Sequence, residues 1–397
     1  MTERERVLAA IRGETSDRVP WVPRLDFWHR AALRKGTVPQ EWRGLSVEEI
    51  AVQLGAGIYA TNPNYQWSMD KVDRSDRGLG LTHFPVQTYE FELDGVERRV
   101  SKRPSEKGTE TVVEYVTPVG VLETAFLMTE EMLDAGTSTA WVSKPPICKP
   151  EDFEPAGYLF EHIKVHPRTD GYLTMRRKVG EHGVVVAPTL GSAGPMHHIM
   201  KQMMFPEQFF YAMADYPEKV YRLAGQMEPF FQAIQESALD SPAEVVYFGG
   251  NYDDSLTPPP LFRKHILPVL KQYAERLHKH GKYLLTHTDG ENRRLIPLYL
   301  EAGFDIADSV CPYPMTQVTL EQIHAAFAGR ITIWGGIPAT QLCPASTDEV
   351  SFRRYVDELI ERYGHAKRII LGVSDMVTAD ADISRLKYLN DRILAIC

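Results

Sequence analysis

The sequence predicts an α/β fold of the (β/α)8 class, a TIM barrel, because short apolar runs alternate with helical stretches. Six of these runs have the length of buried parallel strands and end in polar residues. They cover residues 184–187, 245–248, 283–285, 306–307, 331–334 and 369–371. In such a barrel the active site lies at the carboxyl ends of the strands. We therefore expect the function to lie on one rim.

The amino-terminal part supplies the first two strands and completes the count of eight. Residues 2–11 have apolar residues at helical spacing and are followed by Gly13, a common helix stop. Residues 17–23 then predict the first strand, with prolines tolerated near its ends. A helix over 46–54 leads to a second strand at 58–60.

Between the second and third strands the pattern changes to that of an antiparallel sheet. Residues 89–93 alternate between apolar and polar, Asp94-Gly95 is a hairpin signal, and residues 111–116 and 121–126 repeat the alternation. We expect an inserted β region at about 82–145, which either walls one side of the site or packs on the outside. The chain is then a single barrel domain over residues 1–397.

Helices are predicted in the gaps between the later strands. Apolar residues recur there at intervals of three and four, and several segments begin near Pro, Asp, Ser or Thr. The predicted helices cover residues 206–213, 217–237, 259–280, 292–302, 319–328 and 348–363.

Composition points to a soluble cytoplasmic protein. The chain is 43% hydrophobic and 24% charged, and no window approaches the roughly 18 consecutive apolar residues of a membrane span. The amino terminus lacks the order of a secretory signal. Four scattered cysteines without a CxxC pair fit a reducing compartment. A net charge of −9 leaves no basic stripe for nucleic acid.

The clearest candidate for a metal site follows the strand at 283–285. His287 and Asp289 stand two residues apart where the backbone leaves the sheet, so both side chains can converge on one cation. Cys311 stands at the end of the next strand and can complete a His/Asp/Cys set for zinc, with a position open for substrate. A hydrogen-bonded turn and a buried free cysteine are the alternatives.

Carboxylates at two other strand ends are candidate catalytic groups. Asp253 and Asp254 follow the fourth predicted strand, and Asp375 follows the eighth. Neighbouring carboxylates can bind cations, orient a substrate or share a proton. They can equally cap helices, since Asp near a helix start accepts backbone N–H bonds.

A further set of polar and aromatic residues is predicted to contact a substrate. Its members follow the first four predicted strands, and packed core positions are the alternative for the histidines. The set consists of Trp28, Tyr65, Trp67, His197, His198 and Asn251. The glycine pairs 249–250 and 335–336 allow close backbone approach to a ligand, but they do not form a complete phosphate-binding motif.

Several motifs together resemble the uroporphyrinogen decarboxylase superfamily, which includes cobalamin-dependent methyltransferases. The resemblance extends over nearly the whole chain and implies a (β/α)8 barrel, and homodimers are common among the members. The motifs lie at residues 4–13, 17–20, 117–120, 261–271, 278–281, 287–290 and 334–337.

Departures from the family pattern favour the methyltransferase-like members. True uroporphyrinogen decarboxylases carry an arginine-rich segment after the first strand, whereas this chain has residues 23–30 with aromatic side chains. In the corrinoid-linked methyltransferases a His-x-Cys at the fifth strand and a cysteine near the last strand bind zinc. His287 matches the histidine, Asp289 stands in place of the first cysteine, and Ser374-Asp375 stands near the second.

The resulting hypothesis is a zinc-dependent methyltransferase of the demethylase type. It moves a methyl group from a small methoxylated or N-methylated compound to a corrinoid (cobalamin) on a partner protein, and we expect a homodimer. The metal polarises the heteroatom that carries the methyl group. One alternative is a decarboxylase or lyase that uses the strand-end aspartates, and another is a non-catalytic protein that binds a corrinoid or another flat ligand.

Overall fold

A parallel sheet of six strands lies at the centre of the molecule. The computed structural model describes residues 1–61 and 76–396, and the sheet has the order β7-β8-β9-β10-β11-β12. These strands are β7 (Val186–Pro188), β8 (Val245–Gly250), β9 (Tyr283–His287), β10 (Ile306–Val310), β11 (Thr332–Ile337) and β12 (Ile369–Val373). The prediction of an α/β fold with a parallel sheet is confirmed. Parallel pairing brings all six carboxyl ends to one edge.

The first two predicted strands appear as short hydrogen-bonded segments beside this sheet. Trp21 forms an isolated parallel bridge with Leu371 of β12. The Gly57 N–H donates to the Trp21 carbonyl over 2.8 Å, and the Val186 N–H donates to the Ala60 carbonyl over 3.0 Å. Segments 20–22 and 57–60 therefore connect β12 to β7. Prolines at 20 and 23 remove two N–H donors, which limits the ladder of the first segment to one bridge.

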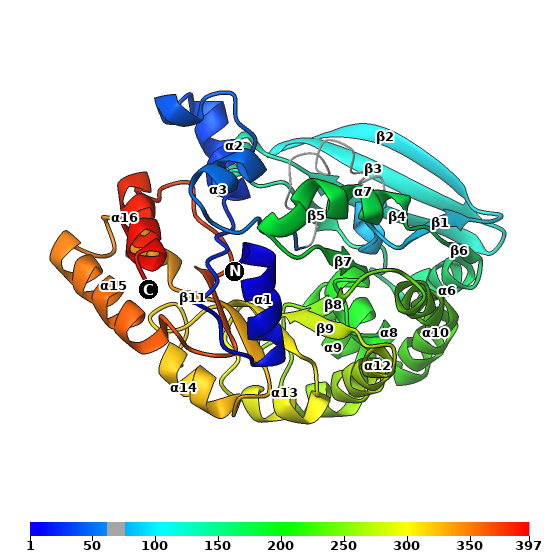
Figure 1. Cartoon of the computed structure of the whole chain (residues 1–397). Coiled ribbons are helices and arrows are strands. Elements are labelled where there is room, and N and C mark those ends of the chain that lie inside the picture. The colour runs from blue at the N-terminus through cyan, green and yellow to red at the C-terminus, as the bar shows by residue number, and fades with distance from the viewer. Residues whose placement is uncertain (62–75, 397) are drawn as a thin grey trace.

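Helices follow the strands and lie on the outside of the sheet, as the arc from α10 to α16 shows (Figure 1). The amino-terminal helix α1 (Glu3–Arg12) begins with a capping box of Thr2 and Glu5 and ends at Gly13, as predicted. The predicted helix over 259–280 is one continuous helical run with a π-helical turn (Phe262–Ile266) just before α12. The other longer helices are α2 (Asp26–Lys35), α3 (Val47–Gln53), α6 (Phe153–Glu161), α7 (Asp170–Val179), α9 (Pro206–Asp215), α10 (Pro217–Leu239), α12 (Leu267–Lys279), α13 (Ile296–Ala302), α14 (Leu320–Ala326), α15 (Glu349–Tyr363) and α16 (Ile383–Leu394). No helix within residues 1–61 and 76–396 is long and apolar enough to cross a membrane.

Antiparallel strands lie between segment 57–60 and β7, to one side of the parallel sheet (Figure 1). They form two sheets, one of order β2-β3-β4-β5 and one that pairs β1 with β6, so the antiparallel region continues past residue 145. The strands are β1 (Tyr89–Leu93), β2 (Glu97–Ser105), β3 (Gly108–Thr117), β4 (Gly120–Leu127), β5 (Trp141–Lys144) and β6 (Ile163–Pro167). The Tyr89 hydroxyl donates to the Thr189 carbonyl over 3.2 Å, which joins β1 to the end of β7.

Gly249, near the end of β8, is a position that requires glycine. Its φ is +79°, and a Cβ built there would lie 2.1 Å from the Tyr252 hydroxyl. We predict that Gly249→Ala lowers the free energy of unfolding by about 2 kcal/mol or more, since it combines backbone strain with a steric clash. Urea denaturation measures the effect.

Gly225 in α10 provides the matched control. A Cβ at this position meets nothing within 4 Å, and alanine is the better helix former. Gly225→Ala should leave stability within about 1 kcal/mol of the wild type or raise it. Equal stability of both variants would contradict the proposed constraint at β8.

Candidate functional site

Three carboxylates, from the ends of three strands, surround His287, the last residue of β9. Its Nδ1 lies 2.8 Å from Oδ2 of Asp308 on the neighbouring strand β10. Its Nε2 lies 3.4 Å from Oδ1 of Asp289 and 3.6 Å from Oδ1 of Asp375, which follows β12. The sheet explains the first contact, because His287 and Asp308 are register partners.

Asp308 fixes the orientation of the imidazole. Its carboxylate is buried and also accepts a hydrogen bond from the Tyr59 hydroxyl, at 2.9 Å and 3.1 Å to its two oxygens. As an ionised carboxylate only accepts, the Nδ1–H of His287 donates to it and Nε2 faces Asp289 and Asp375. A carboxylate behind an imidazole in this way is typical of metal-binding and catalytic histidines.

The charged carboxylates raise the proton affinity of His287. Burial alone lowers the pKa of His287, but the charge of Asp289, its hydrogen bond, and the Asp308 carboxylate outweigh burial and raise this pKa to about 10. The same imidazole lowers the pKa of Asp289 against the opposing effect of burial. The pair is therefore charged at neutral pH in the site as described.

Arg24 holds Asp375 from the other side of the site. Its Nη1 donates to Oδ1 of Asp375 over 2.7 Å, and its Nε donates to Oδ1 of Asp26 over 3.0 Å. Burial opposes the charge, but Asp26 and Asp375 raise the pKa of Arg24 further, so the guanidinium stays protonated. Neither Arg24 nor Asp308 is among the predicted site residues. The polar residue directly after the apolar run 306–307 is the signal that points to Asp308.

Lys201 and Asn251 hold Asp289. Lys201 lies in the π-helical turn Ile199–Met203. Its Nζ donates to the carbonyls of Gly191 and Gly250 and to Oδ1 of Asn251. The Asn251 Nδ2 in turn donates to Oδ1 of Asp289 over 2.7 Å. An ammonium only donates, so it fixes the amide orientation of Asn251. Burial lowers the pKa of Lys201 to about 8.

Of the predicted catalytic carboxylates, Asp375 joins the site, whereas Asp253 and Asp254 bind neighbouring loops. Asp253 accepts the backbone N–H groups of Ser255 over 2.9 Å and Glu291 over 3.2 Å. Asp254 accepts the N–H and the Nη2 of Arg294, each over 2.9 Å. Neither aspartate caps a helix, since the helices that follow, α11 (Pro259–Leu261) and α13, have Pro258 and Leu295 as their N-cap residues and no side-chain cap. Both side chains tie the loop after β8 to the loop after β9.

The predicted substrate-contacting residues divide into three groups. Asn251 lies in the site. His197, His198 and Trp28 are buried in the core: His197 accepts the Ala193 N–H over 3.0 Å, His198 contacts the Leu79 carbonyl over 2.8 Å, and Trp28 packs edge-on against Trp42. Burial lowers the pKa of His198 to about 4. Tyr65 and Trp67 lie outside the described residues.

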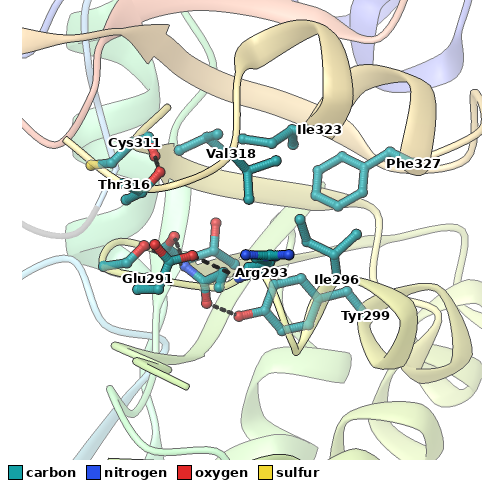
Figure 2. A pocket seen from close by; sticks show the side chains of 13 residues that line it. Glu291, Arg293, Ile296, Tyr299, Cys311, Thr316, Val318, Ile323 and Phe327 are labelled. Atoms are coloured by element: carbon teal, nitrogen blue, oxygen red, sulfur yellow. Dashed lines mark hydrogen bonds between the residues drawn. The ribbon is translucent and has the colours of Figure 1, made fainter. Parts of the chain in front are cut away.

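Cys311 lines a crevice beside the site, between α13 and α14. Figure 2 shows Cys311 and Thr316 at one end of the crevice and the apolar Ile323 and Phe327 at the other. The thiol donates to the Ser309 carbonyl over 3.3 Å, and burial raises its pKa to about 12. Within residues 1–61 and 76–396, no group of three or more His, Cys, Asp or Glu side chains is arranged to hold a metal ion.

By class, this is an α/β protein with a polar site at the carboxyl ends of a parallel sheet. Comparison with known proteins identifies its family. The uroporphyrinogen decarboxylase (URO-D) family model matches residues 135–394. The chain belongs to this family, which confirms the resemblance found in the motifs. Comparison with the curated proteins gives no match.

Solved structures show a related fold. A methyltransferase from Methanosarcina mazei matches with a TM-score of 0.50 and 13% identity, over 99% of this chain and 98% of that chain. At this identity the likeness concerns the fold alone. An isomerase from Streptomyces coelicolor A3(2) matches with a TM-score of 0.16 and 10% identity, over 72% of this chain and 87% of that chain, which is too low to indicate a shared fold.

The Asp308–His287 contact generates a prediction. Asp308→Asn keeps the shape of the side chain but removes the charge that holds Nδ1 of His287, so catalytic activity should fall by about 10- to 100-fold. Steady-state kinetics with the substrate that the protein turns over measures the effect.

Asp305→Asn is the matched control, since Asp305 precedes the same strand and pairs with His278 at 2.9 Å. Its effect should be confined to stability. Equal losses of activity in both variants would show that the Asp308 contact serves folding alone.

Proposed function

We propose that the protein is a methyltransferase of the demethylase type. The observation that carries the proposal is the orientation of His287, whose Nδ1 is held by Asp308 while Nε2 faces Asp289 and Asp375. Membership of the uroporphyrinogen decarboxylase family and the fold likeness to a methyltransferase support it. We also infer that segments 20–22 and 57–60 close the parallel sheet into the predicted (β/α)8 barrel, supported by their hydrogen bonds to β12 and β7.

The residue types of the site are ones that bind zinc, but His287, Asp289 and Asp375 are not arranged to hold an ion as they stand, so zinc binding would require these side chains to move. One imidazole nitrogen and two carboxylate oxygens are ligands that zinc takes in catalytic sites, and a carboxylate behind the histidine is the usual outer contact. His287, Asp289 and Asp375 would hold the ion, and Cys311 remains a predicted ligand without a described contact to His287. A bound zinc ion would polarise the heteroatom that carries the methyl group and improve it as a leaving group.

Neighbouring residues orient the side chains that would hold the ion. Asp308 orients the imidazole, Lys201 and Asn251 orient Asp289, and Arg24 holds Asp375. Arg24 and a cation would compete for Asp375, so metal binding would displace this ion pair. Oxygen-rich ligands suit an oxygen or nitrogen heteroatom better than a thiol. The substrate class we propose is therefore a small methoxylated or N-methylated compound, with a corrinoid on a partner protein as acceptor.

Metal analysis combined with a transfer assay tests the proposal. His287→Ala and Asp289→Asn should each weaken zinc binding by about 10- to 100-fold, because each removes a ligand. Both should lose methyl transfer from methoxylated and N-methylated donors to reduced cobalamin. Elemental analysis and the formation of methylcobalamin are the measurements.

Two control variants sharpen this test. His278→Ala removes a histidine from the opposite end of the sheet, where it pairs with Asp305, and should keep both zinc and activity. Cys311→Ser separates the two ligand sets: retained zinc supports Asp375 as the third ligand, and lost zinc supports Cys311. Full activity in a rigorously metal-free preparation would defeat the zinc mechanism.

A decarboxylase of a small carboxylic acid is the second candidate, and Arg24 favours it. A buried guanidinium at the site, paired with Asp375 over 2.7 Å, is the group that a substrate carboxylate would bind. Release of carbon dioxide from candidate acids distinguishes the two activities. Arg24→Lys would abolish this release, because an ammonium loses the bidentate geometry.

A further inference from the structure

The hydroxyl of Tyr247 lies at the site. Tyr247 belongs to β8, is 5% exposed, and packs in the same apolar cluster as Tyr59, Leu285 and Trp334. A Cβ built on Gly250 would lie 3.2 Å from this hydroxyl and 2.6 Å from the Cβ of His287. The hydroxyl oxygen therefore lies close to the Cβ end of the His287 side chain.

Residues 1–61 and 76–396 leave space next to this hydroxyl. Within this part of the chain, a Cβ built on Gly191 would meet the Tyr247 hydroxyl at 3.6 Å and the Lys201 Nζ at 3.9 Å, which are ordinary contacts. Gly191 and Gly250 are also the two glycines whose carbonyls accept from Lys201. Because Gly191 and Gly250 carry no side chain, they leave room for a ligand to approach the hydroxyl.

The Tyr247 hydroxyl has no hydrogen-bond partner among residues 1–61 and 76–396. Two other buried tyrosines have hydrogen-bond partners. The Tyr59 hydroxyl donates to Asp308, and the Tyr252 hydroxyl bonds to the Thr286 hydroxyl over 2.8 Å. The Tyr247 oxygen is not fully enclosed, so a ligand in the site can reach it. A reachable hydroxyl without a partner among residues 1–61 and 76–396 can form a hydrogen bond with that ligand.

We propose that Tyr247 donates a hydrogen bond to the substrate at the floor of the site. This inference rests on the proposed function and deepens it, since the acceptor would be a neutral oxygen or nitrogen of the methyl donor. The hydroxyl keeps its proton, as burial and the charges of Asp308 and Asp289 raise the pKa of Tyr247. The nearby carboxylates disfavour an anionic acceptor at this point.

Two phenylalanine variants test the inference. Tyr247→Phe removes an unpaired hydroxyl, so its melting temperature should equal or exceed that of the wild type, while kcat/KM for methyl transfer should fall by about tenfold or more. Tyr252→Phe removes a paired hydroxyl of similar burial. It should show the reverse pattern, with a lower melting temperature and kcat/KM within about threefold of the wild type.

Gly191→Ala probes the same space with the hydroxyl retained. The added methyl group fits without a clash but stands beside the hydroxyl, so KM should rise while the melting temperature and the zinc content stay unchanged. A Tyr247→Phe variant with wild-type kcat/KM would overturn the inference. A melting temperature lowered as much as in Tyr252→Phe would also overturn it, because the hydroxyl would then have a protein partner.

Failure of the proposed function gives a different result. If the wild-type protein transfers no methyl group from any donor in the panel, the methyltransferase proposal fails whatever the variants do. The melting temperatures then decide the inference alone: an unchanged or raised value for Tyr247→Phe supports a hydroxyl reserved for a ligand, and a lowered value refutes it.

Discussion

The contact between Asp308 and His287 is the constraint on which the rest of the site depends. Parallel pairing of β9 with β10 sets the two residues opposite each other, so the register of the sheet creates the contact. A buried carboxylate is costly unless it is paired and hydrogen-bonded. Asp308 meets that requirement with His287 and the Tyr59 hydroxyl. With Nδ1 of His287 committed in this way, Nε2 is left as the atom that faces Asp289 and Asp375.

Backbone strain gathers at the same strand ends. Five non-glycine residues of the described chain have a positive φ, and three of them, Asn251, Ser309 and Ser374, follow or end β8, β10 and β12. Such conformations cost free energy and persist where the surrounding contacts impose them. Asn251 contacts Lys201 and Asp289, and Ser309 donates to Asp375 over 3.2 Å. Two of the strained residues, Asn251 and Ser309, therefore turn polar side chains towards the aspartates of the site.

The sequence allowed part of this site to be predicted, since buried parallel strands read as apolar runs and their ends are visible. His287, Asp289, Asp375 and Asn251 were predicted in this way, and the structure brings them together. Arg24 and Tyr59 were missed because their positions depend on how the two short amino-terminal segments join the sheet. Lys201 lies in a methionine-rich helix that resembles core. The structure places His197 and His198 in the core and Asp253 and Asp254 in contact with neighbouring loops. The sequence could not indicate these contacts, because a lone polar residue near a strand end carries no information about its partner.

Two partly buried cations, Lys201 and Arg24, accompany the aspartates of the site. A free thiol in a buried place stays neutral, as the raised pKa of Cys311 illustrates, whereas a carboxylate brings a charge that must be compensated. Asp289 is held by Asn251, which Lys201 orients, and Asp375 is held by Arg24. Lys201, through Asn251, and Arg24, which also pairs with Asp26, thus compensate part of the charge of Asp289 and Asp375. A zinc ion bound to Asp375 would take over part of the charge compensation that Arg24 provides. Metal binding would therefore weaken the Arg24–Asp375 ion pair.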